Sequence, residues 1–117
     1  MVIKKESEIL EVEVEEEGVK NVIRKILIGP EDGSQNIIMR HFKILPKGHT
    51  PYHQHPLEHV VKIVKGMGQI VSETGDEFLI REGQSVFVKS NEKHQFKNPF
   101  QEPFEFLCII LNPEKIP

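Results

Sequence analysis

The sequence has a single cysteine and no tryptophan in 117 residues. Because Cys108 is alone, an internal disulfide is excluded, and its apolar surroundings FEFLCII predict a small buried side chain. No apolar run approaches the roughly 18 residues that a membrane-spanning helix needs. The start MVIKKESEIL lacks the sustained apolar segment of a secretory signal. We therefore expect a cytoplasmic protein with no membrane partner.

A strong charge of either sign is also lacking. The chain has 15 Lys and Arg against 18 Asp and Glu, which gives a formal net charge of -3. Such a balance creates no broad positive field, so we expect no nucleic-acid partner. The length and an apolar content of 38% suit one domain over residues 1–117. No repeat, linker or low-complexity tail suggests a second domain.

No long stretch holds a helical period. The apolar residues come in short Val-, Ile- and Phe-rich runs separated by Gly, Pro, Asn and Asp, a pattern typical of an all-β sandwich or barrel. Gly66, Gly68, Gly75 and Gly83 are expected to supply the positive φ angles of tight turns. The segment EVEVEEE is expected to form an exposed edge strand. The expected strands cover residues 8–14, 19–28, 36–45, 59–65, 69–73, 77–81, 85–89, 95–97 and 104–111.

Histidine, by contrast, is abundant, with six residues in the chain. His53, His55 and His59 lie within one seven-residue segment. On an extended chain, residues two apart point to the same face about 6.6 Å apart, so His53 and His55 could bind one ion at about 2.1 Å. Pro56 cannot donate to a β-ladder, so we expect a bend after it that returns His59 to the same site.

A fourth histidine, His94, follows a turn signal at residues 89–93 and is expected to begin another strand, from which it could close the site. The predicted metal ligands are therefore His53, His55, His59 and His94. Imidazole ligands alone allow Mn, Fe, Co, Ni, Cu or Zn. His41 and His49 have no neighbouring histidine in the pattern, and we expect structural or solvent-facing roles for both.

The residues around these histidines resemble the two motifs of the cupin superfamily, G-x5-H-x-H-x(3,4)-E-x6-G and G-x5-P-x-G-x2-H-x3-N. The first corresponds to GHTPYHQHPLEH at residues 48–59 followed by Gly66, and the second to Gly83, His94 and Asn98. The resemblance covers most of the chain and implies a jelly-roll barrel, an antiparallel double-stranded β-helix. It places N-terminal strands in residues 1–28 and the conserved barrel in residues 36–112. It also implies a homodimer with the metal near the mouth of the cavity.

The departures from these motifs are informative. His59 stands where the family has a glutamate, so the chain is similar to small single-domain cupins with four histidine ligands. Glu58 is the alternative ligand, although in a strand it would point the opposite way. Lys47, Lys89 and Asn91 stand at glycine or proline positions, where they affect turns. The resemblance implies one divalent transition metal per chain, with Mn or Fe favoured and Zn, Ni, Cu or Co possible.

Strand parity predicts the wall of the cavity. An outward Glu105 turns the alternate residues of its strand inward, and an outward Lys43 turns Arg40 inward, where it could bind an anionic substrate. Residue 96 shares a face with His94. The resulting pocket candidates are Arg40, Phe96, Phe106 and Cys108. A surface or ion-pair role for Arg40 and a plain core role for the two phenylalanines remain alternatives.

Four neutral imidazoles would leave a divalent ion with its full charge, so the site should favour anionic ligands. Six-coordination leaves two adjacent positions open, whereas four-coordinate zinc would be closed and structural. The leading hypothesis is a metal-dependent oxidoreductase, dioxygenase-like, acting on a small, partly apolar molecule. One alternative is a metal-dependent lyase or isomerase with His41, His49 or Glu58 as base. The other is a non-catalytic protein that binds a small molecule.

Overall fold

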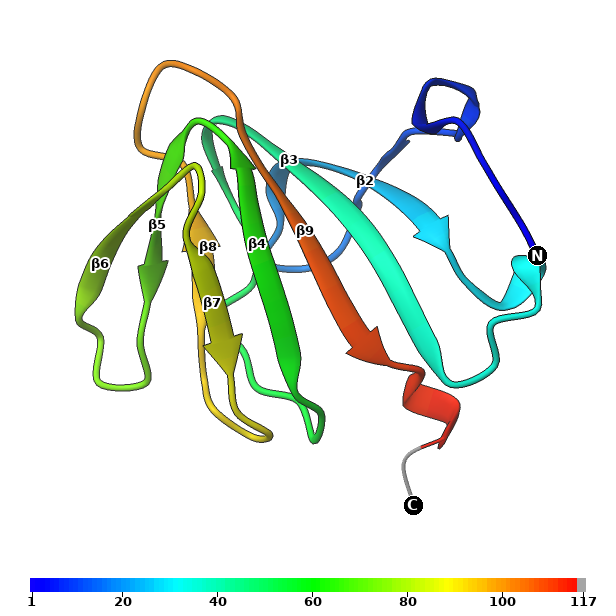
Figure 1. Cartoon of the computed structure of the whole chain (residues 1–117). Helices are drawn as coiled ribbons and strands as arrows, with labels where there is room; N and C mark the ends of the chain where they lie inside the picture. The colour runs from blue at the N-terminus through cyan, green and yellow to red at the C-terminus, as the bar shows by residue number, and fades with distance from the viewer. Residues whose placement is uncertain (116–117) are drawn as a thin grey trace.

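The computed structural model describes residues 1–115, in which every strand pairing is antiparallel (Figure 1). Three short 3-10 helices, η1 (Glu6–Glu8), η2 (Pro30–Asp32) and η3 (Pro113–Lys115), interrupt the strands. No helix in these residues is long and apolar enough to cross a membrane. The strands are β1 (Val12–Glu13), β2 (Lys20–Ile28), β3 (Ile37–His49), β4 (His59–Lys65), β5 (Met67–Val71), β6 (Glu77–Arg81), β7 (Ser85–Val88), β8 (Gln95–Lys97) and β9 (Phe104–Leu111).

The strands form one sheet that curls on itself in the order β6-β5-β8-β3-β9-β4-β7, with β2 also paired to β3 and β1 paired to β2. The long strand β3 joins two parts of this sheet, because its first eight residues pair with β9 and its last residue, His49, pairs with Lys97 of β8. A Cβ atom at Gly48 would lie 2.7 Å from the Lys20 carbonyl oxygen, so only glycine permits this close approach. The curled sheet confirms the predicted all-β jelly-roll class.

The core lies inside the curl. The alternate residues of β9, beginning with Phe104, are buried, and those between them are more exposed. The same alternation places His59, Val61 and Ile63 of β4 inside. Strand parity therefore orients the inward residues as predicted, including Phe106 and Cys108. Burial of this apolar face, at about 25 cal/mol per Å², is the main stabilising contribution to the fold.

Several local predictions were wrong, and β5 covers Met67–Val71 in place of the expected residues 69–73. The strand expected at residues 8–14 shortens to the two-residue β1, because an edge strand with exposed, repelling glutamates has one neighbour and no buried face to hold it. Gly68 does not occupy a positive-φ turn, since Gly66 at φ 74° makes that turn alone. Gly68 lies within β5, where a Cβ atom would overlap the ring of Phe104. Its small size, and not its flexibility, is what the fold requires.

Asn98 links β3 to the connection between β8 and β9. It is 1% exposed, and its side-chain amide donates hydrogen bonds of 2.8 Å to the carbonyl oxygens of Ile44 and Glu102. Its Oδ1 accepts a hydrogen bond of 3.0 Å from the backbone N–H of Phe100. One backbone carbonyl of β3 and two backbone groups of the β8–β9 connection therefore depend on one side chain.

Replacing Asn98 with alanine is expected to destabilise the fold by about 2–4 kcal/mol, because it leaves these buried backbone groups without partners. Urea denaturation followed by circular dichroism measures the effect. Asn36→Ala is the matched control, since Asn36 is exposed, and it should change stability by less than about 0.5 kcal/mol. Equal stability of the two variants would show that the hydrogen bonds of Asn98 do not stabilise the fold.

Candidate metal centre

The histidines are brought together by backbone contacts between two loops. His53 and His94 form an isolated antiparallel bridge, in which each backbone N–H donates to the other's carbonyl, at 3.1 and 2.9 Å. The backbone N–H of Asn91 donates to the His55 carbonyl at 2.6 Å. Asn91 adopts a φ of 64°, a left-handed conformation that asparagine tolerates. The residue at this glycine position therefore shapes the turn and positions His55.

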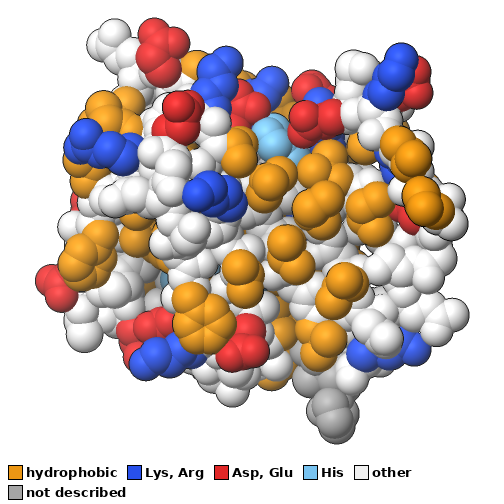
Figure 2. Space-filling model, in the orientation of Figure 1, with side chains coloured by type: hydrophobic (Ala, Val, Ile, Leu, Met, Phe, Trp, Pro, Cys, Tyr) orange, Lys and Arg blue, Asp and Glu red, His pale blue; other side chains and the backbone are white. Residues whose placement is uncertain are grey.

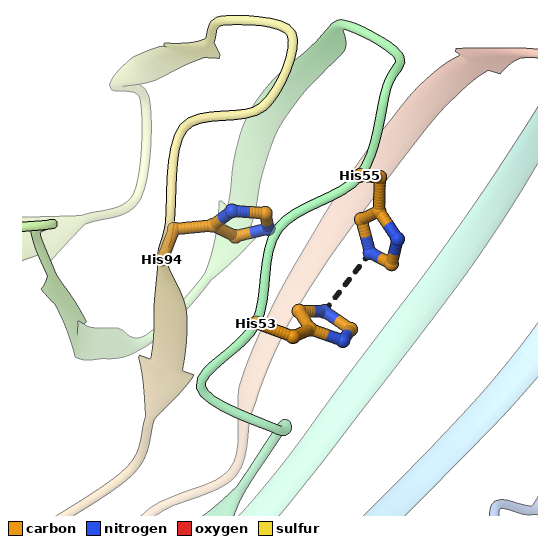
Figure 3. A group of neighbouring side chains, drawn as sticks. All are labelled: His53, His55 and His94. Atoms are coloured by element: carbon orange, nitrogen blue, oxygen red, sulfur yellow. Dashed lines mark hydrogen bonds between the residues drawn. The ribbon is translucent and has the colours of Figure 1, made fainter.

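Three histidines offer ligand atoms to one point. One ring nitrogen from each of His53, His55 and His94 lies within 4.8 Å of the others, and Figure 3 shows the three rings gathered from two segments. The Nε2 atoms of His53 and His55 are 3.0 Å apart. Two ligands at right angles on bonds of about 2.1 Å would be about 3.0 Å apart. The spacing of this pair therefore fits neighbouring ligands of one ion.

His94 is held in the orientation that a ligand needs. Its Nδ1 lies 2.8 Å from the Glu92 carbonyl oxygen, so Nδ1 carries the proton and donates to that oxygen. The lone pair is therefore on Nε2, which is available to an ion. A backbone carbonyl that fixes the tautomer of a histidine in this way is common behind metal ligands.

His59 begins β4 and lies beside this group, although it is not one of the three clustered residues. Its ring centroid is 5.0 Å from that of His94 and 5.2 Å from that of His55. Its Nδ1 is buried and has no hydrogen-bond partner among the described residues. A buried polar atom without a partner is costly, and an ion bound by Nδ1 itself would relieve that cost. The four-histidine ligand set stays a prediction.

The pKa values of all four histidines are lowered, which favours the neutral imidazole. Burial lowers the pKa of His53 to about 4, with a further contribution from the neighbouring charges of His55 and His94. Burial also lowers the pKa of His59 to about 3, with help from His94 and His55. The pKa values of His55 and His94 are lowered, again mainly by burial. Neutral imidazoles are the form that binds metal ions.

The metal-free protein should lose stability as the pH falls from about 6.5 toward 4. The unfolded chain takes up protons on these histidines near pH 6.5, whereas folded His53 does so only near its pKa of about 4. Protons therefore favour the unfolded state in this window. Urea denaturation in EDTA at several pH values measures the effect, and the double variant His53→Gln/His59→Gln should show a flatter profile. A midpoint independent of pH in the wild type would contradict the prediction.

The histidines line a cavity of about 230 Å³ with an aromatic wall. Phe106 stacks on Phe42 at 5.3 Å and on Phe96 at 4.6 Å between ring centroids. The cavity brings together all four predicted ligands and all four pocket candidates, Arg40, Phe96, Phe106 and Cys108. The structure thus gathers these residues at one place, while their roles in binding stay predictions.

Arg40 and Cys108 touch each other in this cavity. The Nη2 atom of Arg40 lies 3.2 Å from the Cys108 sulfur, and its guanidinium lies 4.9 Å from the centre of the Phe42 ring. Burial raises the pKa of the Cys108 thiol, an effect that Arg40 partly opposes. A protonated, buried thiol is a poor nucleophile, in agreement with the small buried side chain predicted for Cys108.

The candidate bases of the sequence prediction lie elsewhere. His41 is buried outside the cavity lining, with its Nε2 atom 3.0 Å from a Glu105 carboxylate oxygen. His49 and Glu58 do not line the cavity either. Glu58 is exposed in a separate groove, which also removes it from the ligand positions.

Several cavity residues were not predicted. Glu16 and Arg24 line the cavity from the N-terminal segment, and Thr50 lines it between β3 and His53. The Thr50 hydroxyl accepts a hydrogen bond of 2.9 Å from the Phe96 backbone N–H. Only the register of β2 on β3 places Arg24 there, and nothing in the local sequence indicates it.

The curled β-sheet, the cavity inside it and the histidine cluster together define a small β-barrel with a candidate metal site. Residues 40–110, more than half of the chain, match the cupin domain family. The chain belongs to this family. Metal binding is therefore plausible, and the three-histidine cluster is its structural basis in this chain.

Similar proteins differ in size and activity. The sequence is 33% identical over 76 residues to auxin-binding protein 1 of Arabidopsis thaliana, covering 58% of this chain and 38% of that protein. The fold superposes on a polyketide cyclase from Streptomyces resistomycificus with a TM-score of 0.90 and 25% identity, covering 95% of this chain and 79% of that one. It also superposes on a predicted oxalate decarboxylase from Thermotoga maritima with a TM-score of 0.83 and 24% identity, covering 94% and 98%.

Proposed function

We propose that the chain binds one divalent transition metal through His53, His55, His59 and His94 and oxidises a small, partly apolar molecule with dioxygen. The observation that carries this proposal is the convergence of neutral imidazoles on one aromatic-lined cavity. Mn and Fe are the favoured metals. A bound ion of this kind would supply Lewis acidity and redox chemistry.

The protein's own residues would bind the substrate and orient a metal ligand. The stacked rings of Phe42, Phe96 and Phe106 would bind an apolar substrate body and exclude water. His94 would keep its orientation through its bond to the Glu92 carbonyl. A dioxygenase places both atoms of O₂ in the product, so no external reductant is required.

Oxygen uptake tests the proposal. Protein purified without added metal is first analysed for its metal content, then stripped and reloaded separately with Mn, Fe, Ni or Cu. Uptake is measured with a panel of phenolic and dicarbonyl compounds. We expect consumption of one O₂ per substrate with a redox-active metal and none with the zinc-loaded control. An absence of uptake with every metal would rule out the oxygenase.

A second candidate is a metal-dependent cyclase or other lyase or isomerase that works without oxygen. The likeness to a polyketide cyclase supports it, and so does Glu16, a carboxylate in the cavity lining that acts electrostatically on His55. Glu16 would serve as the base in place of His41, His49 or Glu58. Substrate loss under anaerobic conditions that disappears in Glu16→Gln would favour this candidate. Ligand binding without turnover under either condition would favour the non-catalytic alternative.

A further inference from the structure

Arg40 lines the cavity, and its hydrogen-bond donors are not all satisfied within the protein. Its Nε is buried without a partner, and its Nη2 contacts only the Cys108 sulfur, a weak acceptor. In residues 1–115, no carboxylate lies within 4.0 Å of its guanidinium. Because a buried donor without a partner costs about 1–3 kcal/mol, this arrangement suits an arriving acceptor.

A second guanidinium lies on the neighbouring strand. Arg24 is opposite Phe42 and Arg40 is opposite Ile26, so the two arginines are diagonal neighbours on the inner face of β2 and β3. Both line the cavity with the histidines. Glu16 is the carboxylate in the same lining, and it forms no ion pair with either arginine in the described structure. The cavity therefore has an excess of positive charge.

We infer that the cavity takes a small carboxylate with an aromatic or apolar body, and that Arg40 determines this specificity. The planar guanidinium matches a carboxylate, which can accept two parallel hydrogen bonds from it. Arg24 adds charge, and the phenylalanine wall contacts the body of the ligand. The inference deepens the proposed function by naming the substrate class of the same site.

Benzoate and its neutral analogue benzamide test this inference by calorimetric titration or ligand-observed NMR. Each is added to the protein as purified and to the protein after chelation. We expect benzoate to bind at least tenfold more tightly than benzamide in both preparations. Arg40→Gln should remove this preference, and Arg40→Lys should retain part of it, because it keeps the charge but loses the planar donors.

The matched control is Arg81→Gln, which changes an exposed arginine on β6 and should leave benzoate affinity unchanged. Circular dichroism confirms that each variant is folded. Equal affinity for the two probes, no benzoate binding, or an unchanged preference in folded Arg40→Gln would each overturn the inference. Because chelated protein is included, failure of the metal proposal would not produce these results.

Apolar side chains also lie on the outer face of the sheet, where Phe87 is 55% exposed, Val60 53% and Ile109 40%. Figure 2 shows hydrophobic side chains gathered over this face. The homodimer that the family resemblance implies stays a prediction.

Discussion

Replacing His94 with alanine is expected to lower the bound metal at least tenfold at a fixed free metal concentration. His94 is 5% exposed, and its tautomer is set by the Glu92 carbonyl, so its Nε2 is already directed for binding. Loss of residues that merely support ligands costs about 10–100-fold in affinity, and loss of a ligand should cost at least as much. Elemental analysis after equilibrium dialysis against Zn²⁺ or Mn²⁺ gives the occupancy.

His49→Ala is the control for this experiment, because His49 does not line the cavity. It should retain the wild-type metal content. Equal metal content in the two variants would show that the ion, if bound, does not use the histidine cluster. Circular dichroism of both variants separates loss of a ligand from loss of the fold.

His59 distinguishes a three-histidine site from a four-histidine site. If it is a ligand, His59→Ala should also lower occupancy at least tenfold, whereas His59→Glu should retain metal because a carboxylate can replace an imidazole as ligand. Full retention of metal in His59→Ala would reduce the ligand set to His53, His55 and His94. In that case the unpartnered Nδ1 of His59 would need another explanation.

The fold was most predictable where local signals agreed. Strands β4, β6, β8 and β9 have the predicted bounds, because alternating apolar residues end at Gly, Pro or Asn turns. Strand β3 runs four residues beyond its prediction, through Pro46 and Gly48 to His49. That extension depends on pairing with Lys20 of β2 and Lys97 of β8, which are distant in sequence. Local pattern alone carries no information about such partners.

In the candidate site, too, features set by the local sequence were predicted, and features set by distant contacts were not. The spacing of His53 and His55 indicated convergence, and the rings do converge, although only His53 lies on a β-bridge and neither residue is in a strand. The backbone contact of Asn91 with His55 replaces the expected strand geometry. Glu16 and Arg24 were missed because their place in the cavity depends on how the N-terminal segment folds back onto β3. Residues that reach the cavity from a distant segment are thus harder to predict than histidines that are neighbours in sequence.

Metal removal is expected to lower the melting temperature by about 16 °C. The metal-free protein holds four buried or half-buried imidazoles together, and their pKa values are lowered. Because His59 Nδ1 has no hydrogen-bond partner in the described structure, the folded protein does not fully replace the water contacts that these rings lose. An ion present at about 1,000 times its dissociation constant would add about 4 kcal/mol to stability. For a domain of this size that corresponds to roughly 4 °C per kcal/mol.

Differential scanning calorimetry of chelated and reloaded protein measures this shift at pH 7.5, where the histidines are neutral in both folded and unfolded chains. His94→Ala should show a much smaller shift on reloading than the wild type, which assigns the stabilisation to the cluster. His49→Ala should respond as the wild type does. A wild type whose melting temperature does not change on reloading would show that the cluster binds no metal tightly, and the four imidazoles would then have to be explained by the ligand of the cavity alone.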